Sequence, residues 1–235
     1  MQDKLSTPED FTVEDGILIK YSGDGNIVTV PDGVECIFDL AFFSKGHIKS
    51  LTLPETLVEI GSHALYGMAG LVELKLPDTL KKIGERACAM TSVRELTVPH
   101  GVSVISKGAF GYSRRLKSLT LCEGICEIGE GAFFLNDRLC ELEIPKSVIK
   151  IGRSAFSGCR SLRTLSLCEG LVEIGAEAFS DCESLCEVTI PSTVRVIGRA
   201  AFPDTPRLTV LCDNPEAIPP TWNLGKNIRI KRAMH

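Results

Sequence analysis

The feature that most constrains this chain is a period of about 23 residues that runs through most of its sequence. The position that ends the apolar stretch of each repeat is occupied by Pro31, Pro54, Pro77, Pro99, Cys122, Pro145, Cys168 and Pro191. These positions follow one another at spacings of 23, 23, 22, 23, 23, 23 and 23, and a degenerate one, Cys212, comes 21 residues later. A period of this length is typical of a solenoid, in which each repeat packs only against its neighbours.

The apolar residues keep fixed offsets from these positions. One repeat contains Leu139, Leu142, Ile144, Pro145, Val148, Ile151, Gly152, Ala155 and Phe156. The stretch before the proline alternates apolar and polar residues, which predicts a short strand with one face in the core. The V-x-x-I-G stretch is expected to turn the chain, with the glycine column (Gly61, Gly84, Gly129, Gly152, Gly175 and Gly198) adopting unusual dihedral angles. The Ala-Phe pair then opens a short helical turn on the opposite wall.

The pattern therefore predicts an α/β solenoid of about eight 23-residue repeats, with a parallel β-sheet on one face and short helical turns or loops on the other. Because parallel strands lie roughly 4.8 Å apart, eight repeats form an arc on the order of 40 Å long. A single elongated domain is expected over residues 1–235, with an N-terminal cap at 1–26, repeats at 27–207 and a C-terminal cap at 208–235. The last 23 residues, which contain Pro215, Pro219, Pro220 and Trp222, lose the repeat.

The motif I-G-x-x-A-F after L-x-x-L-x-L-P resembles the BspA-like class of leucine-rich repeats, over residues 27 to 212. The opening segment, Phe11 to Val34, is similar to the β-rich N-terminal cap of that family, with three strands joined by turns at Asp15-Gly16 and Ser22 to Asn26. The resemblance implies a leucine-rich repeat arc that serves as an adhesion or interaction module. Such modules occur in bacteria and some protists, often at the cell surface.

Composition and charge exclude several classes of protein. Hydrophobic residues make up 44% of the chain and the net charge is -4. No apolar run reaches the length of a membrane span, so membrane insertion is not expected. Nucleic acid is not expected as a partner because phosphate binding needs a strongly basic surface. The N-terminus has no basic and apolar leader, which predicts a cytoplasmic protein; a secreted or cell-surface protein whose leader has been removed is the alternative.

The ten cysteines follow the repeat register, which favours buried packing positions. Cys140 and Cys186 share one column, and Cys159 and Cys182 share another, where a stacked disulfide stays open if the geometry allows. The alternative is a metal or redox site, because Cys122 and Cys126 are spaced C-x-x-x-C, as are Cys182 and Cys186. The four histidines do not complete such a set, so neither a metal nor another cofactor is expected.

The sequence shows no constellation that predicts catalysis. Ser, His and Asp residues are scattered, and the glycines recur once per repeat instead of forming a phosphate-binding loop. Aromatic residues that could anchor a partner are scarce outside one buried column of phenylalanines, and Tyr21, Tyr66, Tyr112 and Trp222 have no common position. We therefore expect a protein that is not an enzyme.

The remaining candidate sites lie on the exposed surface of the predicted sheet. Two polar rows cross it, and the candidate partner-binding residues in them are Glu73, Glu95, Glu141, Glu143 and Glu187. A basic group is predicted at the turn that leads into the sheet, formed by Arg114, Arg115, Arg138 and Arg160, with only Asp137 to offset it locally. These surfaces predict a protein or glycan ligand. Self-association through the two oppositely charged groups, and a simply solvated surface, remain alternatives.

Overall fold

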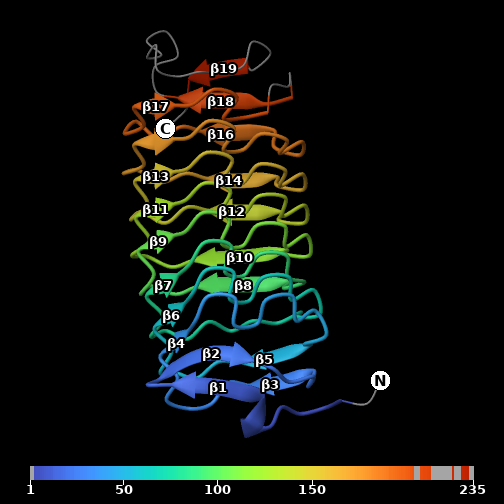
Figure 1. Cartoon of the computed structure of the whole chain (residues 1–235). Coiled ribbons are helices and arrows are strands. Elements are labelled where there is room, and N and C mark those ends of the chain that lie inside the picture. The colour runs from blue at the N-terminus through green and yellow to red at the C-terminus, as the bar shows by residue number, and fades with distance from the viewer. Residues whose placement is uncertain (1–2, 204–206, 213–223, 225–228, 233–235) are drawn as a thin grey trace.

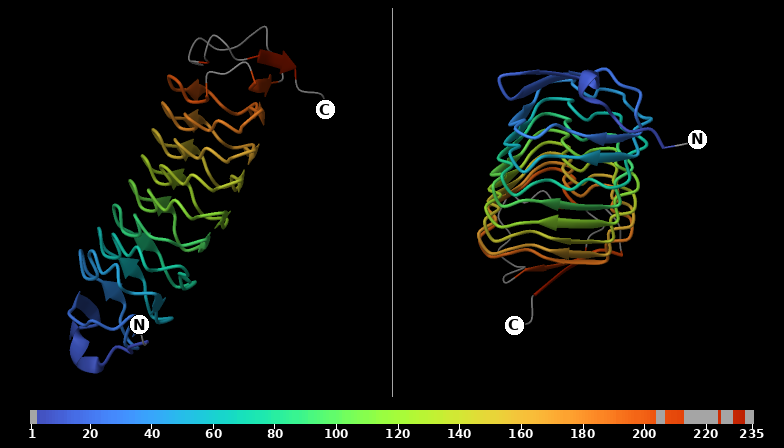
Figure 2. Two further views of the ribbon diagram at one scale, coloured as in Figure 1. Left: turned by 90° about the vertical axis from the view of Figure 1, so that its right-hand side faces the viewer. Right: turned by 90° about the horizontal axis from the view of Figure 1, so that it is seen from below.

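The computed structural model describes residues 3–203, 207–212, 224 and 229–232. Figure 1 shows the chain winding from its N-terminal end upward in stacked coils, and Figure 2 shows that the stack is elongated. Each coil has three walls: two ladders of parallel strands and a wall of turns. The solenoid predicted from the 23-residue period is confirmed, and its core lies between the three walls.

The first ladder consists of the strands that precede the prolines. Its strands are β3 (Ile27–Thr29), β5 (Ser50–Thr52), β8 (Glu95–Val98), β10 (Ser118–Leu121), β12 (Glu141–Glu143), β14 (Thr164–Ser166), β16 (Glu187–Thr189) and β18 (Thr209–Cys212). Neighbouring coils pair in parallel without a shift, so that Glu141 lies beside Thr164 and Glu143 beside Ser166. Every second residue is buried, as the alternation predicts.

The V-x-x-I-G stretch forms a second ladder of strands, which the sequence pattern did not reveal. Its strands are β4 (Cys36–Ile37), β6 (Glu59–Ile60), β7 (Lys82–Ile83), β9 (Val104–Ile105), β11 (Glu127–Ile128), β13 (Lys150–Ile151), β15 (Glu173–Ile174) and β17 (Val196–Ile197). Each strand has two residues, and its isoleucine is at most 1% exposed. This stretch is a strand because the neighbouring coils supply its hydrogen-bond partners.

The Ala-Phe wall consists of hydrogen-bonded turns, and the short helical turns expected there are a minor feature at most. Residues just before the alanine have left-handed backbone conformations, as at Leu40 (φ 63°), Arg86 (φ 50°) and Ser154 (φ 52°). A left-handed residue cannot continue a right-handed helix. The backbone bonds run instead between coils, as from the Phe133 N–H to the Ala155 carbonyl at 2.8 Å. The 3-10 segment η1 (Pro8–Asp10) is the single helical element in the part of the chain that the structure describes.

The glycine column is required for a reason other than the predicted one. Its glycines do not have positive φ angles. Instead, the backbones of successive coils approach closely at this column, so that a Cβ atom on Gly84 would lie 2.5 Å from the Ser62 nitrogen. The prediction of unusual dihedral angles at this column was therefore wrong, and the constraint there is space.

The phenylalanine column forms the internal stack that its register predicts. Phe110, Phe133, Phe156, Phe179 and Phe202 are each at most 3% exposed. Their rings are stacked with centroids 5.2 to 5.5 Å apart and interplanar angles of 10° or less. The stack is interrupted in two earlier coils, which carry Leu65 and Cys88 in this column.

The N-terminal segment closes the first coils. Strands β1 (Phe11–Glu14) and β2 (Ile17–Tyr21) form an antiparallel hairpin whose turn has positive φ at Asp15 and Gly16. Strand β2 continues the second ladder beside β4, whereas β3 begins the first ladder beside β5. The three predicted strands are present, but they belong to two different walls.

At the other end of the stack, β18 pairs in parallel with β16 and with β19 (Arg229–Arg232). The three prolines and the tryptophan predicted to lie in the C-terminal cap fall outside the described residues. Within the described ranges, no helix is both long and apolar enough to span a bilayer.

One coil, between Pro77 and Pro99, departs from the regular stack. It is one residue shorter than the coils on either side of it, and strand pairing is weak there in both ladders. The first ladder is divided again between β10 and β12 and between β14 and β16. The preceding coil joins the first ladder through a single bridge between Ser50 and Glu73, and the second ladder is divided between β7 and β9. The missing residue belongs to the loop after Met90, because the shorter spacing begins beyond that position. The short loop therefore coincides with the one division of the second ladder among the described strands.

The cysteines divide into buried and exposed thiols. Cys88, Cys159, Cys168, Cys182 and Cys212 are buried, as expected for packing positions, but Cys126, Cys140 and Cys186 are exposed. Cys159 and Cys182 are not joined; each thiol donates to a backbone carbonyl, of Phe133 and Phe156 respectively. The expectation of burial was wrong for the three exposed residues.

The difference in burial predicts selective alkylation of the thiols. Burial raises the pKa of Cys88 and of Cys159 to about 12, and it raises the pKa of Cys182 well above its ordinary value. At pH 8 these groups stay protonated and inaccessible in the folded chain. We expect iodoacetamide to label Cys126, Cys140 and Cys186 at least about 100-fold faster, measured by peptide mass spectrometry, and the difference to vanish in denaturant. Equal rates in the folded protein would contradict the buried column.

Candidate binding surfaces

The first ladder places the candidate glutamates on one solvated face. Glu95 lies on β8, Glu141 and Glu143 lie on β12, and Glu187 lies on β16, all with exposed side chains. Glu73 lies between β5 and β8, at the bridge to Ser50. The predicted rows are therefore real rows, because parallel pairing without a shift stacks equivalent residues of successive coils.

These glutamates have few partners on the face itself. None of the described side chains forms an ion pair with Glu141, Glu143 or Glu187. The Lys117 side chain lines the same depression of ≈ 400 Å³ as Glu141 and Glu143, yet lies beyond ion-pair distance. A larger depression of ≈ 630 Å³ lies at the break in the ladder, between Glu73 and Glu95. The face is thus acidic, solvated and shallow.

The predicted arginine group divides into two columns. The first alternates in charge: Arg114 faces Asp137 at 3.9 Å, and Arg160 faces Glu183 at 3.6 Å. The expectation that Asp137 alone offsets these arginines was wrong, because Glu183 continues the column. This column is largely neutralised, although exposed pairs of this kind contribute only about 0 to 1 kcal/mol each.

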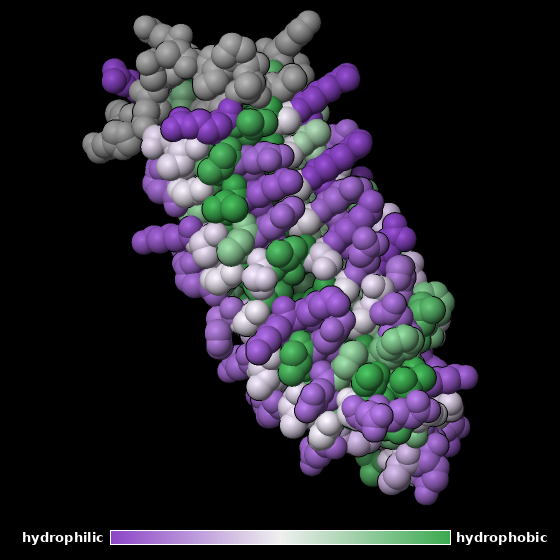
Figure 3. Space-filling model, turned by 60° about the vertical axis from the view of Figure 1, so that its left-hand side comes forward, coloured by the Kyte–Doolittle hydropathy of each residue, from purple (hydrophilic) through white to green (hydrophobic). Residues whose placement is uncertain are grey.

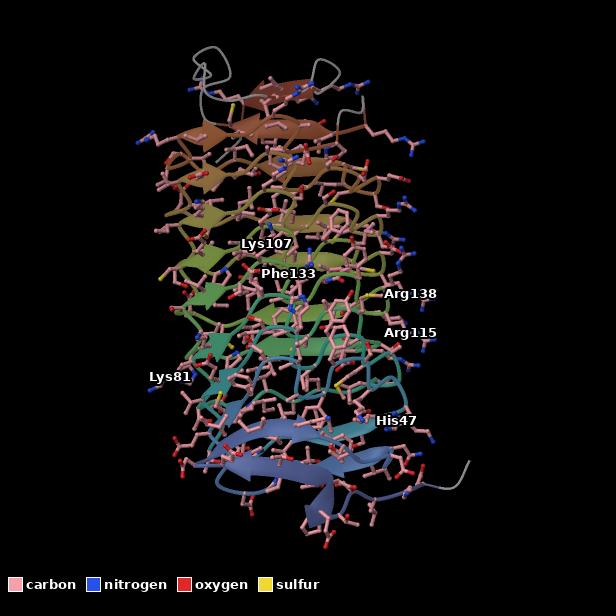
Figure 4. All side chains as sticks on the ribbon, viewed as in Figure 1. His47, Lys81, Lys107, Arg115, Phe133 and Arg138 are labelled. Atoms are coloured by element: carbon pink, nitrogen blue, oxygen red, sulfur yellow. The ribbon has the colours of Figure 1, made fainter. Side chains whose placement is uncertain are left out.

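The second column keeps its positive charge. Arg115 and Arg138 are exposed and form no ion pair with a described residue, and Figure 4 places them one above the other at the rim of the solenoid. The adjoining column, directly before the glutamate row, contributes Arg94, Lys117 and Arg163, which are also exposed and without an ion pair among the described residues. We call these five residues the basic edge. It runs beside the acidic face, so the two charges meet along one border.

The second ladder pairs several of its own charges across coils. Glu59 pairs with Lys82 at 2.6 Å and Glu127 with Lys150 at 3.7 Å, each across neighbouring coils. Figure 3, which brings this wall forward, shows mostly polar side chains with an interrupted track of apolar ones. Exposed apolar residues on this wall include Val104, Ile149, Val172 and Val196. This wall therefore offers less unpaired charge than the first ladder.

The turn wall carries exposed and half-buried aromatic residues that the sequence analysis did not bring together. Phe43 stacks on Tyr66 with centroids 5.3 Å apart, and Tyr112 meets Phe134 edge-on at 5.3 Å. Tyr66 and Tyr112 are thus not scattered, because they lie on the same wall, five residues after Gly61 and six residues after Ser106 respectively. The signal was available in the register: Phe43, Tyr66 and Phe134 occupy one column two residues after the alanine.

The C-x-x-x-C spacing of the cysteines raised the alternative of a metal site. No group of three or more His, Cys, Asp or Glu side chains in the described part of the chain is placed to hold a metal ion. The spacing of Cys122 and Cys126 does not gather further ligands there, since Cys126 is exposed and its thiol donates to the Gly124 carbonyl at 3.5 Å.

Comparison with known proteins agrees with this geometry. The model of the BspA type leucine rich repeat region matches in six copies over residues 21–139 and 133–212. Comparison with curated proteins gives no match. Among solved structures, a leucine-rich repeat protein from Bacteroides ovatus is similar at 23% identity and a TM-score of 0.75, over 88% of this chain and 51% of that protein. This chain thus spans about half the length of that relative.

Two further structures share the fold. A leucine rich cell surface protein from Faecalibacterium prausnitzii has 23% identity and a TM-score of 0.54, with 94% of this chain and 74% of that protein covered. The leucine-rich repeat protein of T. pallidum has 21% identity and a TM-score of 0.53, with 77% and 91% covered. The repeat columns, the two ladders and the matched family model lead to one assignment: this chain belongs to the BspA-type leucine-rich repeat family.

Proposed function

We propose that this chain is a non-catalytic binding module that takes a protein or glycan ligand through the acidic face and the basic edge. The observation that carries the proposal is the border of unpaired charge along the first ladder. Glu141, Glu143 and Glu187 lie on one side of it, and Arg115 and Arg138 on the other, all exposed and without ion pairs among the described residues. Elsewhere on the solenoid, equivalent charges pair across coils.

A charged border of this kind favours a macromolecular ligand of complementary charge. The parallel ladder repeats its side chains at roughly 4.8 Å, so a ligand that spans several coils can meet several charges at once. Such contacts give orientation and a fast association rate, which weaken with added salt. The Faecalibacterium prausnitzii relative is described as a cell surface protein. This supports an extracellular ligand, although a partner in the cytoplasm fits the same surface.

Charge reversal tests the proposal directly. The chain is crosslinked in parallel to proteins of its own cells and to extracellular proteins and glycans, and the affinity for each captured ligand is then measured. We expect the combined change Glu141→Lys, Glu143→Lys and Glu187→Lys to weaken binding of the ligand at least about 10-fold, because several charge pairs are lost together. Arg115→Glu with Arg138→Glu is expected to weaken it as well.

A matched control separates the effect of the site from the effect of net charge. Glu14, Asp32 and Glu35 are exposed and lie at the N-terminal end of the stack, several coils from the three ladder glutamates. Replacing all three by lysine changes the net charge by the same amount. Binding that survives reversal of the three ladder glutamates, or that is lost equally in the control, would contradict the proposal.

Self-association is the second candidate, because the same border carries both signs. Two copies related by a two-fold axis could place the basic edge of each against the acidic face of the other. Sedimentation at increasing protein concentration and at low and high salt distinguishes this function. A salt-sensitive dimer that both charge-reversal variants abolish would support it, and a monomer under all conditions would exclude it.

A further inference from the structure

The turn wall contains a small depression between Tyr66, which is half-buried, and Tyr112, which is exposed. Its volume is ≈ 290 Å³, and the side chains and backbone around it belong to Tyr66, Arg86, Ala89, Met90, Gly111 and Tyr112. One column of this wall carries Phe43, Tyr66 and Phe134. In the two coils between Tyr66 and Phe134, the same column carries Ala89 and Gly111. Two large side chains are thus replaced by small ones, which opens a notch about two coils wide, or roughly 10 Å. We call this the tyrosine notch.

Tyr66 and Tyr112 form the aromatic walls of the notch, and each packs against a neighbouring aromatic ring. Tyr66 is stacked on Phe43 at an interplanar angle of 8°, and Tyr112 packs against Phe134 at 72°. Tyr112 is 46% exposed and Met90 is 43% exposed, so both present apolar surface to solvent. Tyrosine combines such a surface with a hydroxyl that can donate and accept hydrogen bonds. The walls therefore suit a ligand with an apolar face and polar edges.

Arg86, whose side chain is exposed, supplies a positive charge to the lining of the notch. A Cβ atom on Gly108 would lie 2.9 Å from the Arg86 Cγ, so the glycine leaves room for the arginine side chain to cross the next coil. No described carboxylate forms an ion pair with Arg86, whereas Arg153, further along the same wall, is paired with Glu177 at 3.2 Å. The guanidinium in the notch thus keeps its donors available for an anion.

We propose that the tyrosine notch binds a six-membered sugar ring that bears a carboxylate, which is a hexuronic acid unit of a glycan. The Arg86 guanidinium binds the carboxylate through paired hydrogen bonds. The tyrosine rings pack against the C–H face of the sugar, and their hydroxyls bind its hydroxyl groups. Tyr66 and Tyr112 bound the notch along the solenoid axis, so a compact ring fits it better than an extended peptide. The site lies on a different wall from the acidic face and the basic edge, and does not depend on the proposed function.

Titration calorimetry with defined oligosaccharides tests the site. The probes are a trimer of galacturonic acid, the uncharged galactose trimer, and a capped tripeptide whose central residue is glutamate. We expect the folded wild-type chain to bind the uronic acid trimer and to bind the galactose trimer at least about 10-fold more weakly. Arg86→Gln is expected to remove this preference, and Tyr112→Ala to weaken the binding of both sugars at least about 5-fold.

Arg199→Gln is the matched control, because Arg199 is an exposed arginine that follows Pro191, five coils beyond the coil of Arg86, and forms no ion pair with a described residue. This variant is expected to bind the uronic acid trimer within about 2-fold of wild type. Binding to the trimer that is unchanged in both Arg86→Gln and Tyr112→Ala would overturn the proposal, as would no binding of the trimer at all. Binding of the glutamate peptide in its place would also overturn it and assign the notch to an acidic peptide. None of these results bears on the Glu141, Glu143 and Glu187 variants, so the two proposals fail separately.

Discussion

Substitution of Phe156 by alanine is expected to lower the free energy of unfolding by about 3 to 5 kcal/mol. Phe156 is 0% exposed and lies between Phe133 and Phe179, with ring centroids 5.2 Å and 5.4 Å away. Removing the ring takes away its own burial and leaves a cavity that its neighbours cannot fill, because the backbone bonds between coils fix their spacing. Chemical denaturation monitored by circular dichroism measures the change.

The same substitution at Phe38 is the control. Phe38 lies at the start of the turn wall and is 50% exposed, so its removal leaves no closed cavity. We expect Phe38→Ala to cost less than about 1 kcal/mol. If the two variants unfolded at the same denaturant concentration, the phenylalanine column would not be the core of the solenoid.

The repeat period was sufficient to predict much of the fold. Every coil must bury the same columns, so a residue such as Ile144 or Leu142 is placed by its offset alone, and the register of the first ladder follows from the spacing. The acidic rows could be predicted for the same reason, because the polar positions of the strand alternate with buried ones.

The second ladder and the turn wall could not be predicted in this way. A strand of two residues, such as Lys150–Ile151, is too short to show an alternation, and its partners come from the next coil instead of from its own sequence. The left-handed residues include Leu40 and Arg86, whose side chains do not favour that conformation. They adopt it because the bonds between coils stabilise the turn.

The candidate binding surfaces, like the fold, could be predicted from the sequence only in part. The glutamates on the first ladder and the arginines beside it were identified from the sequence, since both belong to regular columns. The pairing of Arg160 with Glu183, and the lack of an ion pair between Arg86 and any described residue, depend on side-chain geometry and were not identified. The tyrosine notch arises where a column loses its large side chains, at Ala89 and Gly111, so an interruption of the pattern marked it more clearly than the pattern itself.

Replacing a glycine of the glycine column is also expected to lower the stability of the fold strongly. Gly175→Ala is expected to lower the free energy of unfolding by about 3 kcal/mol. A Cβ atom at this position would lie 2.6 Å from the Arg153 nitrogen and 2.6 Å from the Gly152 carbonyl carbon, and both are backbone atoms that cannot rotate away. The coils would have to separate, which strains the bond from the Gly175 N–H to the Ile151 carbonyl. The measurement is again denaturant unfolding.

Gly46→Ala distinguishes lack of space from a general cost of replacing glycine. Neither Gly46 nor Gly175 has a positive φ, so backbone strain affects neither substitution. At Gly46 the nearest atom to an added Cβ is the Gly67 carbonyl oxygen at 3.5 Å, an ordinary contact. We therefore expect Gly46→Ala to change stability by no more than about 0.5 kcal/mol. A similar loss in both variants would mean that close packing of the coils is not what requires glycine at this column, and a tolerated Gly175→Ala would mean that the coils can move apart without loss.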